Sequence, residues 1–341
     1  MADNKKEKVG VQDIADILNI SASTVSRALN DHPRISRETK DKVWQVAKRL
    51  GYFSGMPEFS LPAKSDAVTI LAPSLRSDFY IEVIEGIRDH FEKKGFDVFV
   101  LDTLNDDTKA AGFFKKYKSY GTSGVIHIVC NRNIPPGFYS IPLSEALPVV
   151  SILEAEHDHG VSSVLPDMFH GIYNSLGHLK STGIKRISLL LEHEDCPLDH
   201  QIVSSFKSAM ETVFGSAGSL SVFYSNRDEK NLKRFVSSAI NSRARPEVMF
   251  VKDTASAFMV NNELNRAGIN VPEDVLLITI DTVSGVKKLS NNMSILKLPA
   301  YDMGQKAAEM LIAQIRNPKA DKKVSVIPVN FILKGSAMRI G

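Results

Sequence analysis

Cysteine is scarce in this sequence, and the two that occur form no recognisable motif. Cys130 and Cys196 are the only cysteines among 341 residues, and their separation matches no metal-ligand or redox spacing. We therefore expect two free thiols in a reducing compartment. Two histidines, His157 and His159, stand in an acidic segment, but their alternation within a predicted loop favours a solvated loop over a metal site. The sequence predicts no bound metal.

Long apolar runs and a leader segment are also missing. No stretch approaches the ~18 apolar residues needed to cross a bilayer. The first residues, ADNKKEK, are polar and are followed by no apolar segment of the kind found in signal peptides. We therefore predict a cytoplasmic protein that has no membrane partner.

Catalytic signatures are absent as well. The sequence contains no G-x-S-x-G, no P-loop lysine and no paired cysteine cluster. It also has no glycine-rich turn after the first predicted strand, where a dinucleotide-binding fold needs one. We therefore predict no catalytic residues, no cofactor and no enzymatic activity.

Net charge is small, and its distribution is uneven. The chain carries a formal charge of +3, and the whole excess lies before Gly55. This modest excess suits contacts to a few DNA phosphates, but it is too small for tight binding by one copy. Specific binding to DNA would then require a dimer, which doubles the contacts.

The segment from Val9 to Ile35 has the pattern of a helix-turn-helix. Apolar residues recur at helical spacing from Val11 to Leu18, which predicts a short helix over Gln12–Leu18. After a turn, Ser21 is placed to cap a second helix whose buried face is Val25, Ala28 and Leu29. The opposite face carries small or forked side chains that suit a DNA major groove, namely Ala22, Ser23, Ser26 and Arg27.

A third helix is predicted over Ser36–Leu50, capped by Ser36 and ended by Gly51. The run S-x-S-T-V-S-R-x-L-N, followed by I-S-x-E-T-K-x-K-V and L-G-Y, resembles the amino-terminal domain of the lactose/galactose-repressor family of bacterial transcription regulators. The resemblance covers Val9 to Tyr52 almost without gaps. The simpler alternative is a capped helical hairpin that packs on a neighbour.

The resemblance implies a set of DNA contacts. Base edges would be read by Arg27 and Ser23, with an apolar contact from Ala22, whereas phosphates would be held by Thr24, Ser26, Asn30 and Arg34. Gln12 and Ser21 complete the predicted DNA-binding set. In the family a hinge helix follows and wedges a leucine into the minor groove, a position that falls on Leu61 here.

The hinge region, residues 52–65, departs from the family pattern. Pro57 and Pro62 bracket the segment that would be helical, and Pro62 disfavours a helical conformation at Leu61. Glu58 would place a negative charge near phosphates. Two interpretations remain open: the hinge reads DNA in a different way, or it is only a tether.

From Ala67 onward, short apolar runs alternate with amphipathic segments, which predicts an α/β fold with parallel sheets covered on both faces. Two such sets indicate two doubly wound lobes. With the helical domain, this gives an N-terminal three-helix helix-turn-helix domain (residues 1–51), a hinge (52–65) and a two-lobed core (66–341). We assign residues 66–163 and 292–322 to the first lobe and 164–291 and 323–341 to the second. The order of short motifs in this core is similar to that in the family, whose core is like the periplasmic sugar-binding proteins.

Ligands of open α/β sheets bind beyond the carboxyl ends of the strands, so a cleft between the lobes is the predicted site. The family resemblance implies ligand contacts at Asp78, Phe79, Phe206, Asp253 and Asp281, and the two last-named follow apolar runs, at the expected strand ends. Simpler interpretations are a helix cap for Asp78 and a turn residue for Asp281.

One departure bears on the identity of the ligand. Family members that bind sugars or purines carry an arginine at the position of Ile202, and its loss removes a bidentate donor. The effector class therefore stays open and includes compounds other than plain sugars.

Together these patterns predict a homodimeric, ligand-responsive repressor that binds a pseudo-palindromic operator in double-stranded DNA and responds to a small-molecule effector, for example a sugar or sugar derivative. The rival interpretation is a small-molecule-binding α/β protein or enzyme whose helical domain only mediates interaction. A convergent acid, base or nucleophile set would favour the rival, and the sequence offers none.

Overall fold

A computed structural model describes residues 10–29, 32, 35–50, 52, 67–129, 134, 137–154, 160–226, 228–282 and 292–338. Three predicted DNA contacts, Asn30, Arg34 and Leu61, lie outside the described residues, as do the hinge residues 53–65, Gly51, Cys130 and the His157–His159 pair. The chain divides into two compact units, Met1–Ser65 and Asp66–Gly341. Within the described residues no helix is long and apolar enough to cross a membrane.

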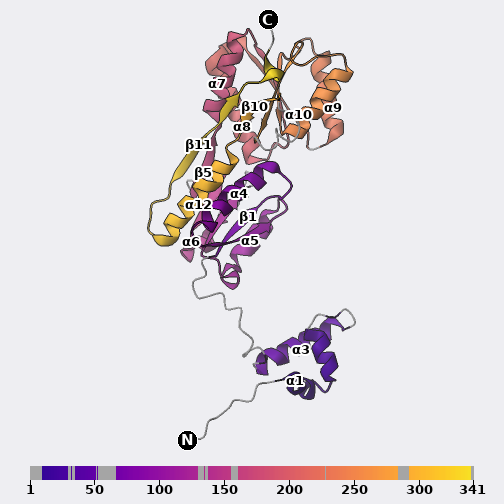
Figure 1. The fold of residues 1–341 in the computed structure, drawn as a ribbon, viewed down its shortest axis with the longest axis vertical. Helices are drawn as coiled ribbons and strands as arrows, with labels where there is room; N and C mark the ends of the chain where they lie inside the picture. Colours follow the sequence, from indigo (N-terminus) through magenta and orange to yellow (C-terminus); the bar gives the residue numbers. More distant parts are fainter. Residues whose placement is uncertain are drawn as a thin grey trace. The chain divides into compact units, whose positions relative to one another are not determined.

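The first unit is a bundle of three helices, α1 (Val11–Leu18), α2 (Ala22–Leu29) and α3 (Arg37–Leu50) (Figure 1). Its small core is built from one face of each helix and includes Ile14, Val25, Ala28, Val43 and Ala47. This is the apolar set that the helical spacing predicted for α1 and α2, although Leu29 is only partly buried.

Both predicted caps of this bundle are present. The backbone N–H of Thr24 donates to Ser21 Oγ at 3.1 Å, and that of Thr39 donates to Ser36 Oγ at 3.2 Å. These hydroxyls satisfy donors that the first helical turn leaves without a partner. Trp44 is 48% exposed on α3, so it packs at the margin of the bundle rather than inside it.

The second unit contains two six-stranded sheets. The first sheet has the strand order β11-β5-β4-β3-β1-β2, and all its pairs are parallel. Its strands are β1 (Ala67–Ala72), β2 (Asp97–Asp102), β3 (Gly124–Ile128), β4 (Val149–Ile152), β5 (Ser162–Asp167) and β11 (Val324–Pro328). The helices of this lobe are α4 (Asp78–Glu92), α5 (Asp107–Phe114), α6 (Ser140–Ser144) and α12 (Ala300–Arg316), with a 3-10 turn at Tyr117–Tyr120.

The second sheet has the order β12-β10-β9-β8-β6-β7 and is parallel except for its β10–β12 pair. Its strands are β6 (Arg186–Leu191), β7 (Ser219–Tyr224), β8 (Val248–Lys252), β9 (Leu276–Asp281), β10 (Ser294–Lys297) and β12 (Asn330–Ile332). The helices of this lobe are α7 (Met168–Ser181), α8 (Pro197–Phe214), α9 (Glu229–Asn241) and α10 (Thr254–Arg266), with 3-10 turns at Gly215–Ala217 and Gly335–Ala337.

The predicted lobe boundaries are wrong in three places. Strand β5, which the alternation of runs did not predict, keeps the chain in the first lobe until Asp167. Strand β10 pairs with β9, so it belongs to the second lobe. Residues 323–341 do not all belong to the second lobe, because β11 pairs with β5 of the first lobe while β12 pairs with β10. The chain therefore crosses between the lobes three times, after β5, β10 and β11.

Two helices of the first lobe pack unusually closely. A Cβ added at Gly304 of α12 would lie 2.1 Å from the carbonyl oxygen of Val83 in α4, and one added at Gly86 would lie 2.2 Å from the carbonyl oxygen of Tyr301. Glycine at both positions allows the two backbones to approach each other. This contact anchors α4, whose first turn faces the site described next.

Candidate functional site

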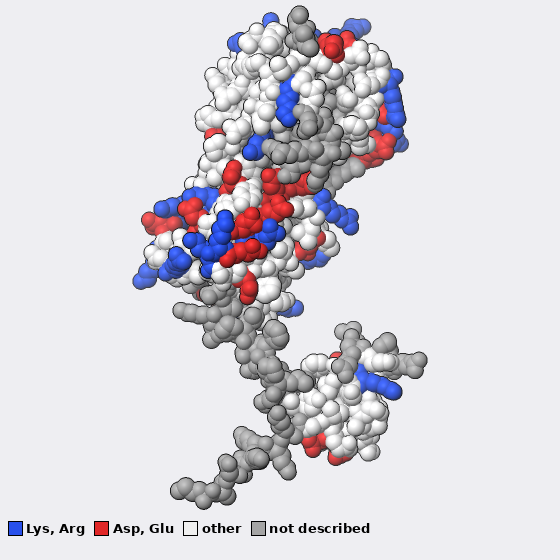
Figure 2. All heavy atoms as spheres, viewed as in Figure 1, with Lys and Arg blue, Asp and Glu red and all other residues white. Residues whose placement is uncertain are grey.

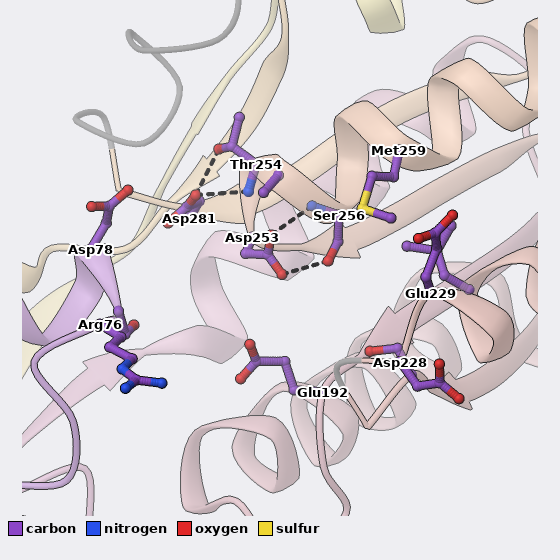
Figure 3. A pocket seen from close by; sticks show the side chains of 14 residues that line it. Arg76, Asp78, Glu192, Asp228, Glu229, Asp253, Thr254, Ser256, Met259 and Asp281 are labelled. Carbon is purple, nitrogen blue, oxygen red and sulfur yellow. Dashed lines mark hydrogen bonds between the residues drawn. The ribbon is translucent and has the colours of Figure 1, made fainter. Parts of the chain in front are cut away.

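A cavity of about 490 Å³ opens between the two lobes of the core. The first lobe contributes the loop between β1 and α4, with Arg76, Ser77 and Asp78. The second lobe contributes the segments that follow β6, β7, β8 and β9, with Glu192, Ser225, Asp228, Glu229, Leu232, Asp253, Thr254, Ala255, Ser256, Met259 and Asp281 (Figure 3). These are carboxyl ends of parallel strands, where α/β sheets bind ligands.

Asp253 lies at the centre of the cavity wall, between β8 and α10 (Figure 3). It caps α10, since its carboxylate accepts hydrogen bonds from the backbone N–H of Ser256 at 2.6 Å and from Ser256 Oγ at 2.7 Å. Burial raises the pKa of Asp253 to about 6, and the nearby carboxylates of Glu192 and Asp281 add to that rise. Near neutral pH this carboxylate is thus ionised at an energetic cost.

Asp281 is the last residue of β9 and is buried beside Asp253. Its Oδ2 accepts from the backbone N–H of Thr254 at 2.8 Å and from Thr254 Oγ1 at 2.6 Å, which ties β9 to the first turn of α10. Burial raises the pKa of Asp281, and the charge of Asp78 from the other lobe acts in the same direction.

Neither of the two aromatic residues predicted to contact a ligand lines this cavity. Phe206 is 0% exposed and packs edge to face on Phe250 with 4.9 Å between ring centroids, so its prediction as a ligand contact is wrong. Ile202, at the family's arginine position, is likewise buried in the core. Phe79 is buried too, but it borders a small cavity of about 40 Å³. The small and the large cavity share the wall residues Ser77, Glu192, Asp253 and Asp281.

A buried ion pair that no sequence pattern predicts lies behind the cavity wall. Lys252, the last residue of β8, donates to Asp199 of α8, and the Asp199 side chain is 0% exposed. Asp199 also accepts from the backbone N–H groups of Glu192 and His193, both at 2.9 Å. Only the three-dimensional neighbourhood reveals this pair, because its members are far apart in the sequence and match no motif.

The helical unit presents its predicted DNA-contacting residues along α1 and α2. Ser23, Ser26 and Arg27 are exposed on α2, whereas Ala22 packs partly against the bundle core. The hydroxyl groups of Ser21 and Thr24 hydrogen-bond each other at 2.8 Å, and the exposed Gln12 donates to Asp16 at 2.8 Å. Arg27 is therefore the one cationic side chain on the described surface of α2.

Comparison with known proteins assigns both units. A family described as bacterial regulatory proteins, lacI family, matches residues 10–54, and a periplasmic binding protein-like domain matches residues 176–337. The chain belongs to the LacI family. It is accordingly a DNA-binding transcriptional regulator and not an enzyme, as the sequence predicted.

Relatives of this LacI-family chain span nearly its whole length. It is 22% identical to the HTH-type transcriptional regulator DegA of Bacillus subtilis, with 96% of this chain and 98% of DegA covered. It is 24% identical to the ribose operon repressor of the same organism, with 94% and 96% covered. A crystal structure of a LacI-family regulator from Enterococcus faecium with bound ribose matches 81% of this chain and all of that chain, with a TM-score of 0.68 and 20% identity. The predicted α/β architecture with two sheets is confirmed.

Proposed function

We propose that this protein is a homodimeric repressor whose affinity for an operator is set by a small molecule in the inter-lobe cavity. The observation that carries the proposal is the cavity itself, since residues of both lobes line it. A ligand that contacts both lobes binds one lobe arrangement better than another, and this differential affinity is what shifts a conformational equilibrium. Because the target is DNA, we place the protein in the cytoplasm.

We propose that α2 enters the major groove and that Arg27 reads a base edge. Its guanidinium is exposed beside Ser23, and a forked donor matches the two acceptors of guanine. Thr24 and Ser26 would then contact phosphates, with Gln12 and Ser21 at the margin of the interface. Asn30, Arg34 and Leu61 stay in the proposal on the family resemblance alone.

A competition gel shift with the DNA upstream of the chain's own gene tests this. Arg27→Ala should weaken operator binding by about 1–3 kcal/mol and relax specificity at one base pair. A mutant that loses the same affinity for every sequence would show that Arg27 contacts phosphate instead. No sequence preference of the wild-type protein at any salt concentration would refute the repressor proposal.

The proposed dimer partner is a second copy of this chain. Strand β2 lies at the edge of the first sheet, and it exposes Phe99, Val100 and Leu101 to 48%, 41% and 37%. Ile81 of α4 and Leu104 after β2 are further exposed apolar side chains of the same lobe. An exposed apolar sheet edge is a surface that another chain covers. Val100→Lys should shift the protein toward monomers in sedimentation velocity, and an unchanged dimer would place the interface elsewhere.

A further inference from the structure

We propose that the effector is a hydroxylated small molecule that carries a cationic nitrogen, such as an amino sugar, rather than a neutral sugar. The inference rests on the proposed function, because it takes the inter-lobe cavity to be the effector site. Four properties of the described cavity wall support it: its net charge, the neutralisation of Lys252 behind it, the spacing of its carboxylates and their placement on both lobes.

The described wall is strongly acidic. Its charged residues are one cation, Arg76, and six carboxylates, namely Asp78, Glu192, Asp228, Glu229, Asp253 and Asp281. On the outer face of the core seen in Figure 2, by contrast, acidic and basic side chains are intermixed over the lobe that contains α4 and α12. The excess of one sign is therefore a property of the cavity and not of that surface.

Lys252, which lies behind the wall, does not neutralise it. Lys252 lies beside the small cavity, but it donates to the buried Asp199 and lies 3.6 Å from Glu192. One positive charge is thus shared between two carboxylates, so it leaves no net positive charge for a ligand. An anionic effector would meet a wall that repels it.

The carboxylates are spread around the cavity rather than gathered at one point. Asp228 and Glu229 lie at one side, Glu192 and Asp253 near the middle, and Asp281 beyond them (Figure 3). Within the described residues no group of three possible ligands could hold a metal ion. Carboxylates spaced in this way, with nearby serine and threonine hydroxyls, suit an organic molecule that offers several donors across a 490 Å³ space.

A cation would stabilise the two central carboxylates most. Asp281 is buried and Asp253 is partly buried, and each already accepts hydrogen bonds from one residue of α10. Those neutral donors do not offset the negative charge, whereas an ammonium group would supply both charge and donors. A neutral hydroxyl offers the donor only, so the cavity should discriminate between the two.

The same charges would couple the ligand to lobe closure. Asp78 comes from the first lobe, and Asp281 and Asp253 come from the second. Like charges on opposite walls oppose closure, and an ammonium between them removes that repulsion. The effector's nitrogen would then favour the closed arrangement of the lobes.

Matched sugars test the inference on the full-length protein. We would measure thermal shifts and calorimetric affinities for D-glucosamine, D-glucose and N-acetyl-D-glucosamine, with the galactose series alongside and chloride matched by NaCl. An amino sugar should bind at least about tenfold more tightly than its neutral counterparts, which is the worth of one charge-assisted hydrogen bond. Its affinity should fall as pH drops below about 6, because Asp253 then takes up a proton.

Two variants and a control locate the effect. Asp253→Asn and Asp78→Asn should each reduce the preference for the amino sugar, one from each lobe. Asp321→Asn removes an exposed carboxylate outside the cavity and should leave that preference unchanged. The Asp78 variant alters a cavity-lining residue at the first turn of α4, so it serves as a second test if the first variant folds poorly.

Sugar binding and operator binding test two different proposals, the cationic effector and the repressor function. Equal or tighter binding of a neutral sugar, or no binding of any amine in the panel, would overturn the cationic effector. If the protein still binds its operator and a neutral sugar releases it in gel shifts, the repressor proposal stands while this inference falls. Absence of sequence-specific DNA binding would instead remove the proposed function.

Discussion

Replacement of Asp253 by asparagine should stabilise the ligand-free core. Burial raises the pKa of Asp253 from 3.8 to about 6, so its ionised form is disfavoured in the folded state. A rise of about two units corresponds to roughly 3 kcal/mol at neutral pH. Asparagine keeps an acceptor for the backbone N–H of Ser256 but loses the charge that strengthens it, a cost of about 1–1.5 kcal/mol. The net gain at pH 7.5 is about 1–2 kcal/mol.

The sign of the pH dependence follows from the raised pKa. Above pH 6 the residue is ionised in both the folded and unfolded states, so the wild type carries the full penalty. As pH falls through 6 the folded state binds a proton, and the penalty shrinks until the unfolded state is protonated near pH 4. The advantage of Asp253→Asn should therefore be largest above pH 7 and close to zero at pH 4.5.

Urea unfolding followed by far-UV circular dichroism at pH 7.5 and 4.5 measures this difference. Tryptophan fluorescence is unsuitable because the single tryptophan, Trp44, lies in the other unit. Asp321→Asn, at an exposed position, should change stability by less than about 0.5 kcal/mol at either pH. A variant that is less stable than the wild type at pH 7.5, or equally stabilised at both pH values, would refute the reasoning.

Three further substitutions probe packing, a buried charge and a cap. Gly304→Ala should destabilise the core by about 1–3 kcal/mol in urea unfolding, because its methyl group meets a backbone oxygen, whereas Gly177→Ala, with nothing within 4 Å, should not. Equal effects would contradict the close helix contact. Lys252→Met should cost about 3–5 kcal/mol by leaving Asp199 buried without its cation, and adding Asp199→Asn should recover part of that loss. No recovery would argue against charge as the cause. Ser21→Ala should cost about 1 kcal/mol of the small unit's stability, read by tryptophan fluorescence, and no loss would exclude a capping role.

Much of the DNA-binding unit could be predicted from sequence because its signals are local. Helical spacing identified Ile14, Val25 and Ala28 as core residues, and the hydroxyls of Ser21 and Ser36 cap helices as expected. A cap involves residues three apart, and a helix face involves residues within two turns. Such patterns need no knowledge of the rest of the chain.

The residues that line the cavity at strand ends could be predicted only in part from the sequence. The sequence placed Asp253 and Asp281 after apolar runs, and parallel sheets bring such ends to one edge. Both do line the cavity. Phe206 does not contact the cavity, because it lies on the face of α8 that packs against Phe250 of the sheet. Which face of a helix meets the sheet depends on the rotation of the helix about its axis.

Local patterns in the sequence were thus enough to predict a LacI-family regulator with a helix-turn-helix and an α/β core. The assignment of β5, β10 and β11 to their lobes depends on the fold, because strands find their partners by long-range pairing that no local pattern encodes. The fold likewise brings Lys252 to Asp199 and places carboxylates from both lobes around one cavity. Charges far apart along the chain act as one field only when the fold brings them together.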